Sequence, residues 1–175
     1  EEAFGVGGFH ELVAGAVGGF PGLNPKTDYA DVAMLIYVGT NPMVSHAHNT
    51  GMFNPAVWIK AATRRGEVWT IDPLFTETAK LSTRHIAAYP GKDYAILAWL
   101  VREIIDGGPL EAQQPVHGLE ELRAALQGLD RPTAAEIAGV PEQDLEDLLA
   151  AMRRKGKVVV ETGTAREVHH FAVLA

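Results

Sequence analysis

Residues 32–42 read Val-Ala-Met-Leu-Ile-Tyr-Val-Gly-Thr-Asn-Pro, an apolar run of strand length that ends in a turn. An apolar run without polar alternation is typical of a parallel strand that is buried on both faces. In open α/β sheets, ligands bind outside the carboxyl ends of the strands. We therefore expect residues 39–45, which follow this strand, to line a binding crevice.

The sequence after residue 45 predicts helices and strands in alternation. A helix is expected from Pro55 to Arg65, with the Asn54 side chain capping its start and Gly66 at its end. Further on we expect a strand over residues 67–72, a helical turn over 77–82, a strand over 85–89 and a helix capped by Asp93. A strand, a helix and a second parallel strand form a right-handed βαβ unit.

The helix after Asp93 is amphipathic. Its expected buried face consists of Leu97, Ala98, Val101, Ile104 and Ile105. The tryptophans at positions 58, 69 and 99 also fall on faces that we expect to be buried.

The second half of the chain predicts three short helices and a returning strand. The helices are expected over residues 119–126, from Thr133 with Glu136 completing a capping box, and over residues 141–154. Residues 157–162 then read as a strand. One face of the third helix carries Leu145, Leu148, Leu149 and Met152, at the spacing of a buried stripe.

These elements indicate an α/β fold, a three-layer Rossmann-like sandwich with a mostly parallel sheet and a small helical insertion. We divide the chain into a glycine-rich lead-in from a preceding domain (1–28), a dinucleotide-binding α/β unit (29–110), the helical insertion (111–155) and a returning strand with the start of a truncated helix (156–175). Both ends of the sequence suggest a piece of a longer protein. In the lead-in, Gly5-Val-Gly-Gly-Phe is either a phosphate loop or a closely packed segment.

Composition excludes several classes of function. The formal net charge of −7, without a basic stripe, argues against nucleic acid as a partner. The absence of cysteine rules out disulfides, iron–sulfur ligation and thiolate metal sites within this sequence. No apolar stretch is long enough to span a bilayer, so we expect no direct membrane insertion, and the compartment is left open. The His46-x-His48 pair could ligate a metal, but no carboxylate or third histidine lies near it in the sequence, so no metal ligand is predicted. No catalytic residue is predicted either.

Parallel topology would bring the loops 39–45, 72–78 and 90–93 to one edge of the sheet, with residues 162–164 as a fourth candidate. Backbone amides near Gly39 can donate to a phosphate, and so can the hydroxyls of Thr40, Ser45, Thr76 and Thr78. Asp72 is placed like the acid that accepts hydrogen bonds from ribose hydroxyls. Asp93 either caps its helix or accepts from the N–H groups of a guanine.

Together the loops indicate a nucleotide-like ligand with a diphosphate, a ribose and a base. No Gly-x-Gly-x-x-Gly follows Val38 and no Walker loop is present, so an ordinary NAD(P) or ATP site is disfavoured.

Several segments resemble, in the same order, motifs of the molybdopterin oxidoreductase (dimethyl sulfoxide reductase) family. Residues 31–42 resemble its pterin-dinucleotide-binding strand and turn, and residues 64–79 look like an Arg-Gly strand ending in Asp-Pro-Arg-x-Thr-x-Thr-Ala. Residues 88–95, Ala-Tyr-Pro-Gly-Lys-Asp-Tyr-Ala, are similar to Pro-Gly-Thr-Asp-x-Ala, and residues 133–145 are like its helical region. The resemblance covers roughly residues 29–165.

The resemblance implies that the crevice holds the guanosine-diphosphate arm of a molybdopterin guanine dinucleotide, with molybdenum or tungsten in the full-length enzyme. It places Gly39, Asn41, Pro42 and Ser45 by the phosphates, Asp72 and Thr76 by the ribose or base, and Gly91 and Asp93 by the guanine. The implied partners are the remaining domains of the parent enzyme and an electron-transfer subunit. Leu74 departs from the family, which often has Arg after Asp-Pro, so a cation is missing near the nucleotide.

A second departure concerns catalysis. The family's metal ligand would fall near residue 1 or before it, and residues 1–8 contain no such motif, with Glu1 or Glu2 as the remaining candidates. We therefore expect this segment alone to lack activity. Two alternatives stay open: a metal-free structural relative that acts as a scaffold in an electron-transfer complex, and an unrelated α/β nucleotide-binding module.

Overall fold

The computed structural model of the 175-residue chain describes residues 32–46, 54–107, 117–156 and 158–162. The expectations for the glycine-rich lead-in, for His48 and for Thr164 lie outside the described residues. Within this part of the chain, no helix has the length and hydropathy that a membrane span requires.

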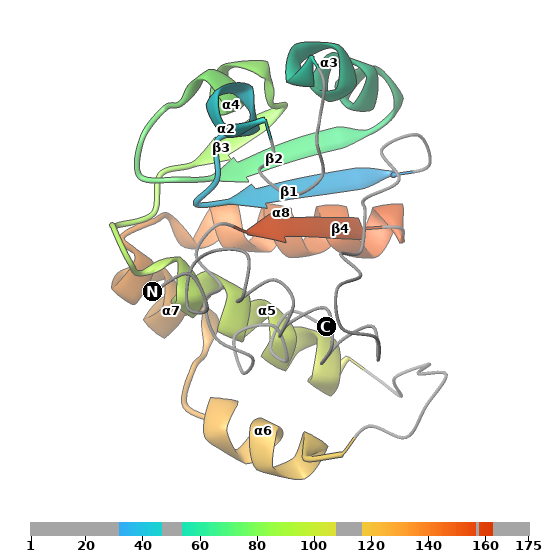
Figure 1. Ribbon diagram of the computed structural model, residues 1–175. Helices are drawn as coiled ribbons and strands as arrows, with labels where there is room; N and C mark the ends of the chain where they lie inside the picture. Colours follow the sequence, from blue (N-terminus) through green and yellow to red (C-terminus); the bar gives the residue numbers. More distant parts are fainter. Residues whose placement is uncertain (1–31, 47–53, 108–116, 157, 163–175) are drawn as a thin grey trace, which may run out of the picture.

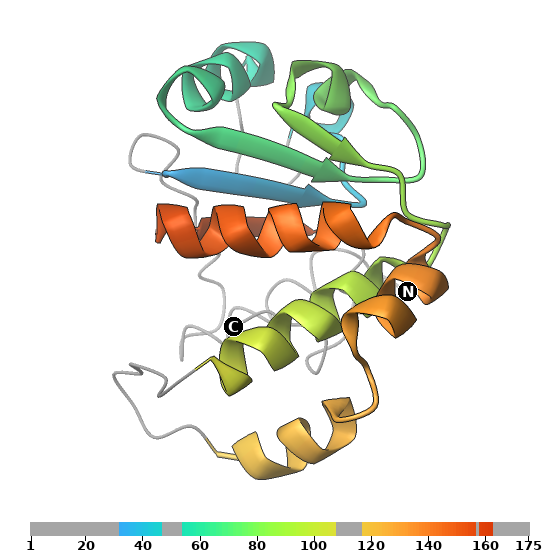
Figure 2. The ribbon, with the colours of Figure 1, turned by 180° about the vertical axis from the view of Figure 1, so that it is seen from behind.

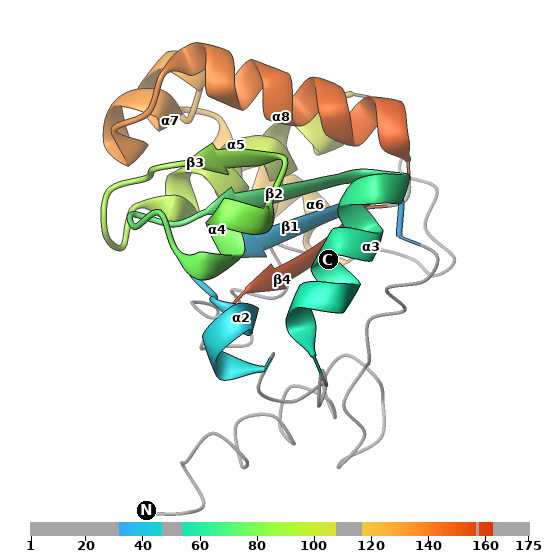
Figure 3. The same ribbon diagram turned by 90° about the horizontal axis from the view of Figure 1, so that it is seen from above.

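Four parallel strands form the central sheet in the order β3-β2-β1-β4, and Figure 3 shows all four arrows running in the same direction. The strands are β1 (Met34–Val38), β2 (Glu67–Ile71), β3 (Arg84–Ile86) and β4 (Val158–Thr162). In the register, Ile36 of β1 lies opposite Trp69 of β2 and Val160 of β4. The predicted parallel α/β sheet is confirmed, and the carboxyl ends of its strands meet at one edge.

Helices cover both faces of this sheet, which confirms the three-layer arrangement (Figures 1 and 2). One face carries α2, α3 and α4, the other carries α5, α7 and α8, and α6 lies outside α5. The helices are α2 (Pro42–Ser45), α3 (Pro55–Arg65), α4 (Glu77–Leu81), α5 (Asp93–Asp106), α6 (Leu119–Leu126), α7 (Arg131–Ala138) and α8 (Glu142–Lys155).

The central strand β1 is buried on both sides, which explains its continuous apolar sequence. Met34 and Ile36 belong to the core on the side of α5, α7 and α8. Leu35 and Tyr37 belong to the core on the opposite side, together with Ile59 of α3. Each of the strand's five side chains is at most 1% exposed.

Helix α8 shares the sheet's own core. Leu145 and Leu148 are fully buried in the same cluster as Met34 and Ile36 of β1, and Met152 packs against that cluster. The predicted stripe on this helix is therefore confirmed. The C-terminal part of the expected helical insertion packs directly on the sheet, while the domain boundaries themselves remain predictions.

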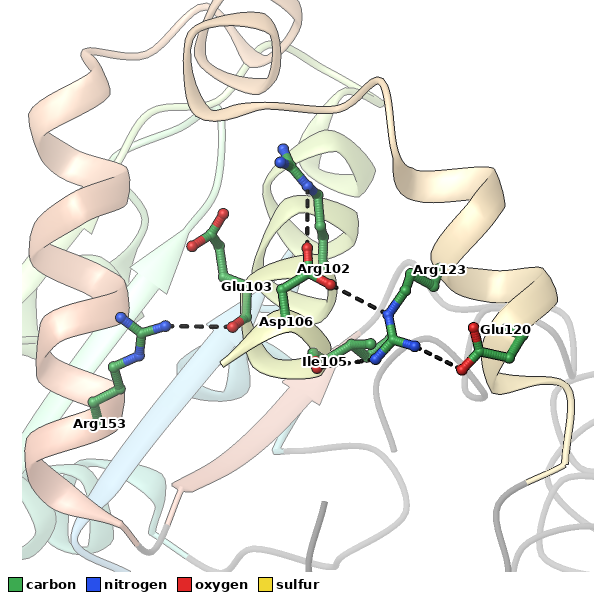
Figure 4. A network of polar contacts seen from close by, with 7 residues as sticks. All are labelled: Arg102, Glu103, Ile105, Asp106, Glu120, Arg123 and Arg153. Atoms are coloured by element: carbon green, nitrogen blue, oxygen red, sulfur yellow. Dashed lines mark hydrogen bonds and ion pairs between the residues drawn. The ribbon is translucent and has the colours of Figure 1, made fainter. Parts of the chain in front are cut away.

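No residue of helix α6 is buried, and polar contacts of Arg123 link it to the end of α5. The Arg123 guanidinium lies 3.3 Å from a carboxylate oxygen of Asp106, 2.6 Å from one of Glu120 and 3.4 Å from the Ile105 carbonyl oxygen (Figure 4). A separate contact joins α8 to α5, where Arg153 donates to the Glu103 carbonyl oxygen at 3.3 Å. Exposed ion pairs contribute about 0–1 kcal/mol each, so α6 is held less firmly than α8.

The helix predicted over Pro55–Arg65 is confirmed with those bounds, but three predicted side-chain caps are wrong. Asn54 has a left-handed φ of 55° and its side chain makes no cap hydrogen bond, and α5 has Lys92, not Asp93, at its N-cap position. Helix α7 begins two residues before Thr133, because the Asp130 side chain accepts from the Thr133 amide at 2.9 Å. Proline at the start of α7 favours this earlier beginning.

Two predicted buried faces also need correction. On α5 the buried side chains are Ala95, Ile96, Trp99, Leu100 and Ile105, whereas four of the five expected residues are half-buried or exposed. Most of the predicted face is displaced by one position, about 100° around the helix, because the face is set by contacts with α7 and the sheet. Trp58 is 41% exposed, although Trp69 and Trp99 are buried as expected.

Strand β3 is shorter than the expected strand over residues 85–89. It pairs with β2 through only three residues, and the Ala88 amide then turns back to the Ile86 carbonyl oxygen at 3.1 Å. This turn, and not Pro90, ends the strand.

Candidate functional site

Three loops follow the carboxyl ends of neighbouring strands, as predicted from parallel topology. We call them the β1 loop (residues 39–46, including α2), the β2 loop (residues 72–76) and the β3 loop (residues 87–92). Thr162 ends β4 at the same edge.

Glycine begins the β1 loop for a conformational reason. Gly39 has a φ of 57°, and its amide donates to the Ile71 carbonyl oxygen at 2.9 Å, so the chain turns sharply as it leaves the sheet. The next residue, Thr40, is half-buried and makes no hydrogen bond to any other described residue. Pro42 follows as the buried first residue of α2. The start of this loop thus leaves a hydroxyl group available to a ligand.

Asn41 joins the β1 loop to helix α4. Its Oδ1 accepts from the Thr78 hydroxyl at 2.7 Å and from the Thr78 amide at 3.3 Å. The same hydroxyl oxygen accepts from the Met43 amide at 3.2 Å. These bonds link the β1 loop to α4. Thr78 is fully buried, so its polar groups find their partners within the protein.

The other side of the Asn41 amide contacts a charge. Its Nδ2 donates to Glu77 Oε2 at 3.0 Å. This hydrogen bond, the Glu77 backbone amide and nearby Lys80 together hold the pKa of the Glu77 carboxyl below its ordinary value. Glu77 is therefore ionised at neutral pH, so a negative charge lies beside the β1 loop.

Most of the hydroxyls that we expected to meet a phosphate are bonded within the protein. The Ser45 hydroxyl donates to the Asn41 carbonyl oxygen at 3.1 Å, and Thr76 Oγ1 accepts from the Ala79 amide at 3.2 Å as the N-cap of α4. Thr78 is buried and bonded to Asn41. Of the four expected hydroxyls, the one at Thr40 makes no such bond to any residue in the described part of the chain.

Asp72 is fixed at the end of β2. Its residue is 9% exposed, its amide donates to the Ile86 carbonyl oxygen at 3.1 Å, and its Oδ1 accepts from the Leu74 amide at 2.9 Å. His85 Nε2 lies 2.8 Å from the Asp72 carbonyl oxygen. Sequence reasoning missed His85, because its closeness to Asp72 depends on the register between β2 and β3.

The β3 loop is positioned by α7. Gly91 has a φ of 69° in an exposed turn, and Asp93 follows as the half-buried first residue of α5. The Tyr89 amide donates to the Ala138 carbonyl oxygen at 2.8 Å. A methyl group at Gly139 would overlap the Tyr89 ring, and the φ of 69° at this position also favours glycine. The structure thus joins the β1 loop to α4, which follows the β2 loop, and fixes the β3 loop through α7.

The loops offer few positive charges. Lys80 pairs with Glu77 at 3.8 Å, and the Lys92 ammonium lies 5.9 Å from the centre of the Tyr94 ring. Leu74, at the position where the resemblance implies an arginine, is 70% exposed. Among the described residues, no three His, Cys, Asp or Glu side chains form a group that could hold a metal ion.

Comparison with known proteins finds no family model that matches the chain. The assimilatory nitrate reductase of Haloferax mediterranei is 28% identical over 117 residues, which cover 65% of this chain and 15% of that protein. The F420-dependent formate dehydrogenase 2 subunit alpha of Methanococcus maripaludis is 26% identical over 136 residues, 76% of this chain and 19% of that protein. The assimilatory nitrate reductase catalytic subunit of Bacillus subtilis is 30% identical over 126 residues, 70% of this chain and 17% of that protein.

Among solved structures, acetylene hydratase from Pelobacter acetylenicus matches with a TM-score of 0.70 and 19% identity, over 90% of this chain and 21% of that one. At this identity the likeness shows the fold alone. The chain spans less than a quarter of the length of each of these proteins. Over the part that they share, the chain is related to the molybdopterin oxidoreductase (dimethyl sulfoxide reductase) family.

Proposed function

We propose that this chain binds the guanosine-diphosphate arm of a molybdopterin guanine dinucleotide, as one domain of a larger molybdenum or tungsten oxidoreductase. The observation that carries the proposal is the fixed carboxylate of Asp72 at the edge of a parallel sheet, next to a β1 loop held by Asn41 and Thr78. The relatives of this segment are named as nitrate reductases and a formate dehydrogenase, and a further one as a tungsten-containing formylmethanofuran dehydrogenase.

The β1 loop would hold the diphosphate. The left-handed turn at Gly39 lets a ligand approach the backbone without meeting a side chain, and the Thr40 hydroxyl can donate to a phosphate oxygen. Asn41, Pro42 and Ser45 would shape this end of the site through the bonds that already hold the loop. Since the loop carries no lysine or arginine, amides and hydroxyls would have to stabilise the phosphate charge.

The β2 and β3 loops would hold the ribose and the base. A carboxylate has about four acceptor positions, and the Leu74 amide takes one of those on Asp72, which leaves acceptors for ribose hydroxyls. Thr76 and Thr78 would act by fixing α4 beneath this loop. Gly91 and Asp93 would lie at the guanine, whose paired N–H groups match a carboxylate.

When bound, the metal–pterin group would supply two-electron redox or oxygen-atom chemistry, and this domain would position its nucleotide end. We assign no catalytic residue and no metal ligand to the described part of this chain. The remaining domains of the parent protein would complete the site. An electron-transfer subunit is a further proposed partner, since three of the relatives are themselves named as subunits.

Replacement of Asp72 by Ala tests the ribose assignment. Titration of the chain with guanosine diphosphate should show about 5- to 100-fold weaker binding, the effect of one lost hydrogen bond from a buried acceptor. Asp72→Asn keeps an oxygen for the Leu74 amide. Its affinity for guanosine diphosphate should therefore lie between the affinities of Asp72→Ala and the wild type. Glu121→Ala, at an exposed acid of α6, should bind like the wild type. Unchanged affinity in a folded Asp72→Ala protein would remove Asp72 from the site.

A further inference from the structure

Phe75 is an exposed aromatic side chain whose ring is nevertheless held in place. It is 61% exposed, and its ring centre lies 5.3 Å from that of His85, with the two ring planes inclined by 61°. This edge-to-face arrangement is one that aromatic pairs favour. Phe75 lies in the β2 loop, three residues after Asp72.

The partner of this ring is itself fixed. A carbonyl oxygen can only accept a hydrogen bond, so the 2.8 Å contact requires that His85 Nε2 carries a hydrogen and donates it to Asp72. On the other side of the loop, the Leu74 amide donates to the Asp72 carboxylate and the Thr76 amide donates to the Leu74 carbonyl oxygen at 2.9 Å. Phe75 therefore stands between two residues whose backbone positions are set, and against a histidine that is tied to Asp72.

A single exposed apolar residue is ordinary on a protein surface. Phe75 differs because the contacts that orient it run through the residue that we assign to the ribose. Ribose and base are adjacent parts of one nucleotide, so a ring fixed beside the ribose acceptor is suitably placed for the base. The β2 loop itself, residues 72–76, contains no lysine or arginine.

We infer that Phe75 is a stacking platform for the guanine base, and that His85 is the positioning residue that orients it. This inference rests on the proposed function, and it adds a contact to the face of the base beside the contacts that Asp93 would make to its edge. Stacking between a base and an aromatic ring binds without reading hydrogen-bond groups.

The test compares guanosine diphosphate, which has a base, with inorganic pyrophosphate, which has none, by calorimetric titration of the same protein. Phe75→Ala should weaken the binding of guanosine diphosphate about 10-fold and leave pyrophosphate binding within about 2-fold. Phe75→Trp should retain the wild-type affinity, because it keeps an aromatic face. Phe75→Leu should behave like Phe75→Ala, because it keeps only apolar area.

Controls separate stacking from a general effect on the loop. Leu74→Ala removes a neighbouring exposed apolar side chain and should leave both affinities within about 2-fold of the wild type. His85→Ala should weaken guanosine diphosphate alone, and thermal unfolding should show that each variant is folded.

The outcomes distinguish this inference from the function on which it rests. Equal losses for both probes, full affinity in Phe75→Ala, or full affinity in Phe75→Leu would each overturn the stacking role. If the wild type and Phe75→Ala bind guanosine diphosphate equally well while Asp72→Ala does not, the proposed function stands and the stacking platform falls. If the wild-type protein binds no guanosine diphosphate, the proposed function fails first.

Discussion

Leu148→Ala is expected to lower the free energy of unfolding by about 2–5 kcal/mol, the range for a leucine removed from a packed core. Leu148 is fully buried on α8, in the same cluster as Met34 and Ile36 of the central strand. Its removal would leave a cavity between α8 and the sheet that the surrounding helices can close only partly. Urea unfolding of both proteins, followed by circular dichroism, measures the difference.

The matched control is Leu126→Ala on α6, a helix without buried residues. Leu126 is half-buried, so its replacement should cost about 1 kcal/mol or less. If Leu148→Ala were no more costly than Leu126→Ala, α8 would not belong to the core of the sheet.

Asn41→Ala is expected to lower the free energy of unfolding by about 1–3 kcal/mol, because it leaves buried hydrogen-bond donors without an acceptor. The Thr78 hydroxyl and amide both donate to Asn41 Oδ1, and Thr78 has no exposed surface through which water could replace that oxygen. The Glu77 carboxyl would also lose the strongest of the contacts that lower its pKa. The connection between the β1 loop and α4 would be broken at its centre.

A double-mutant cycle with Thr78→Val isolates this connection. The two replacements should be non-additive by about 0.5–3 kcal/mol, since both remove the same hydrogen bond. Ser45→Ala is the control, because its exposed hydroxyl bonds to the Asn41 carbonyl oxygen and to no other described residue, and it should change stability by less than about 0.5 kcal/mol. Additive effects of Asn41→Ala and Thr78→Val would show that the connection does not exist in solution.

The sheet was predictable because burial on both faces leaves a plain pattern in the sequence. The apolar run at β1 and the β-branched and aromatic residues of β2 predict their own strands, and parallel pairing then places the loops together. The stripe at Leu145 and Leu148 was equally clear. Such patterns are local, and the residues that produce them are adjacent or one helical turn apart.

Helix starts and the face of α5 were less predictable, because they depend on tertiary contacts. At α7, Asp130 and Thr133 are both good cap residues, and only the path of the chain decides that Asp130 is the cap. On α5, apolar residues occupy most positions around the helix, so periodicity could not choose between the face with Leu97 and the face with Ile96. Packing against α7 makes the choice.

For the candidate site, the sequence predicts the meeting of the loops but not the partners within them. Thr76 and Thr78 are alike in sequence, yet one caps α4 and the other is buried against Asn41. The contact of His85 with Asp72 spans 13 positions and follows from the pairing of β2 with β3. Contacts of this kind are set by register, which no local pattern specifies.

The central claim is most directly tested by the content of the full-length protein as purified from its own cells. Metal analysis by mass spectrometry and chromatography of acid-released nucleotides measure molybdenum, tungsten and guanosine monophosphate per polypeptide. Our account predicts one of the two metals in an amount comparable to the protein, with at least one guanine nucleotide per metal atom. A folded full-length protein that carries neither metal, pterin nor guanine nucleotide would contradict it, and would favour the metal-free scaffold.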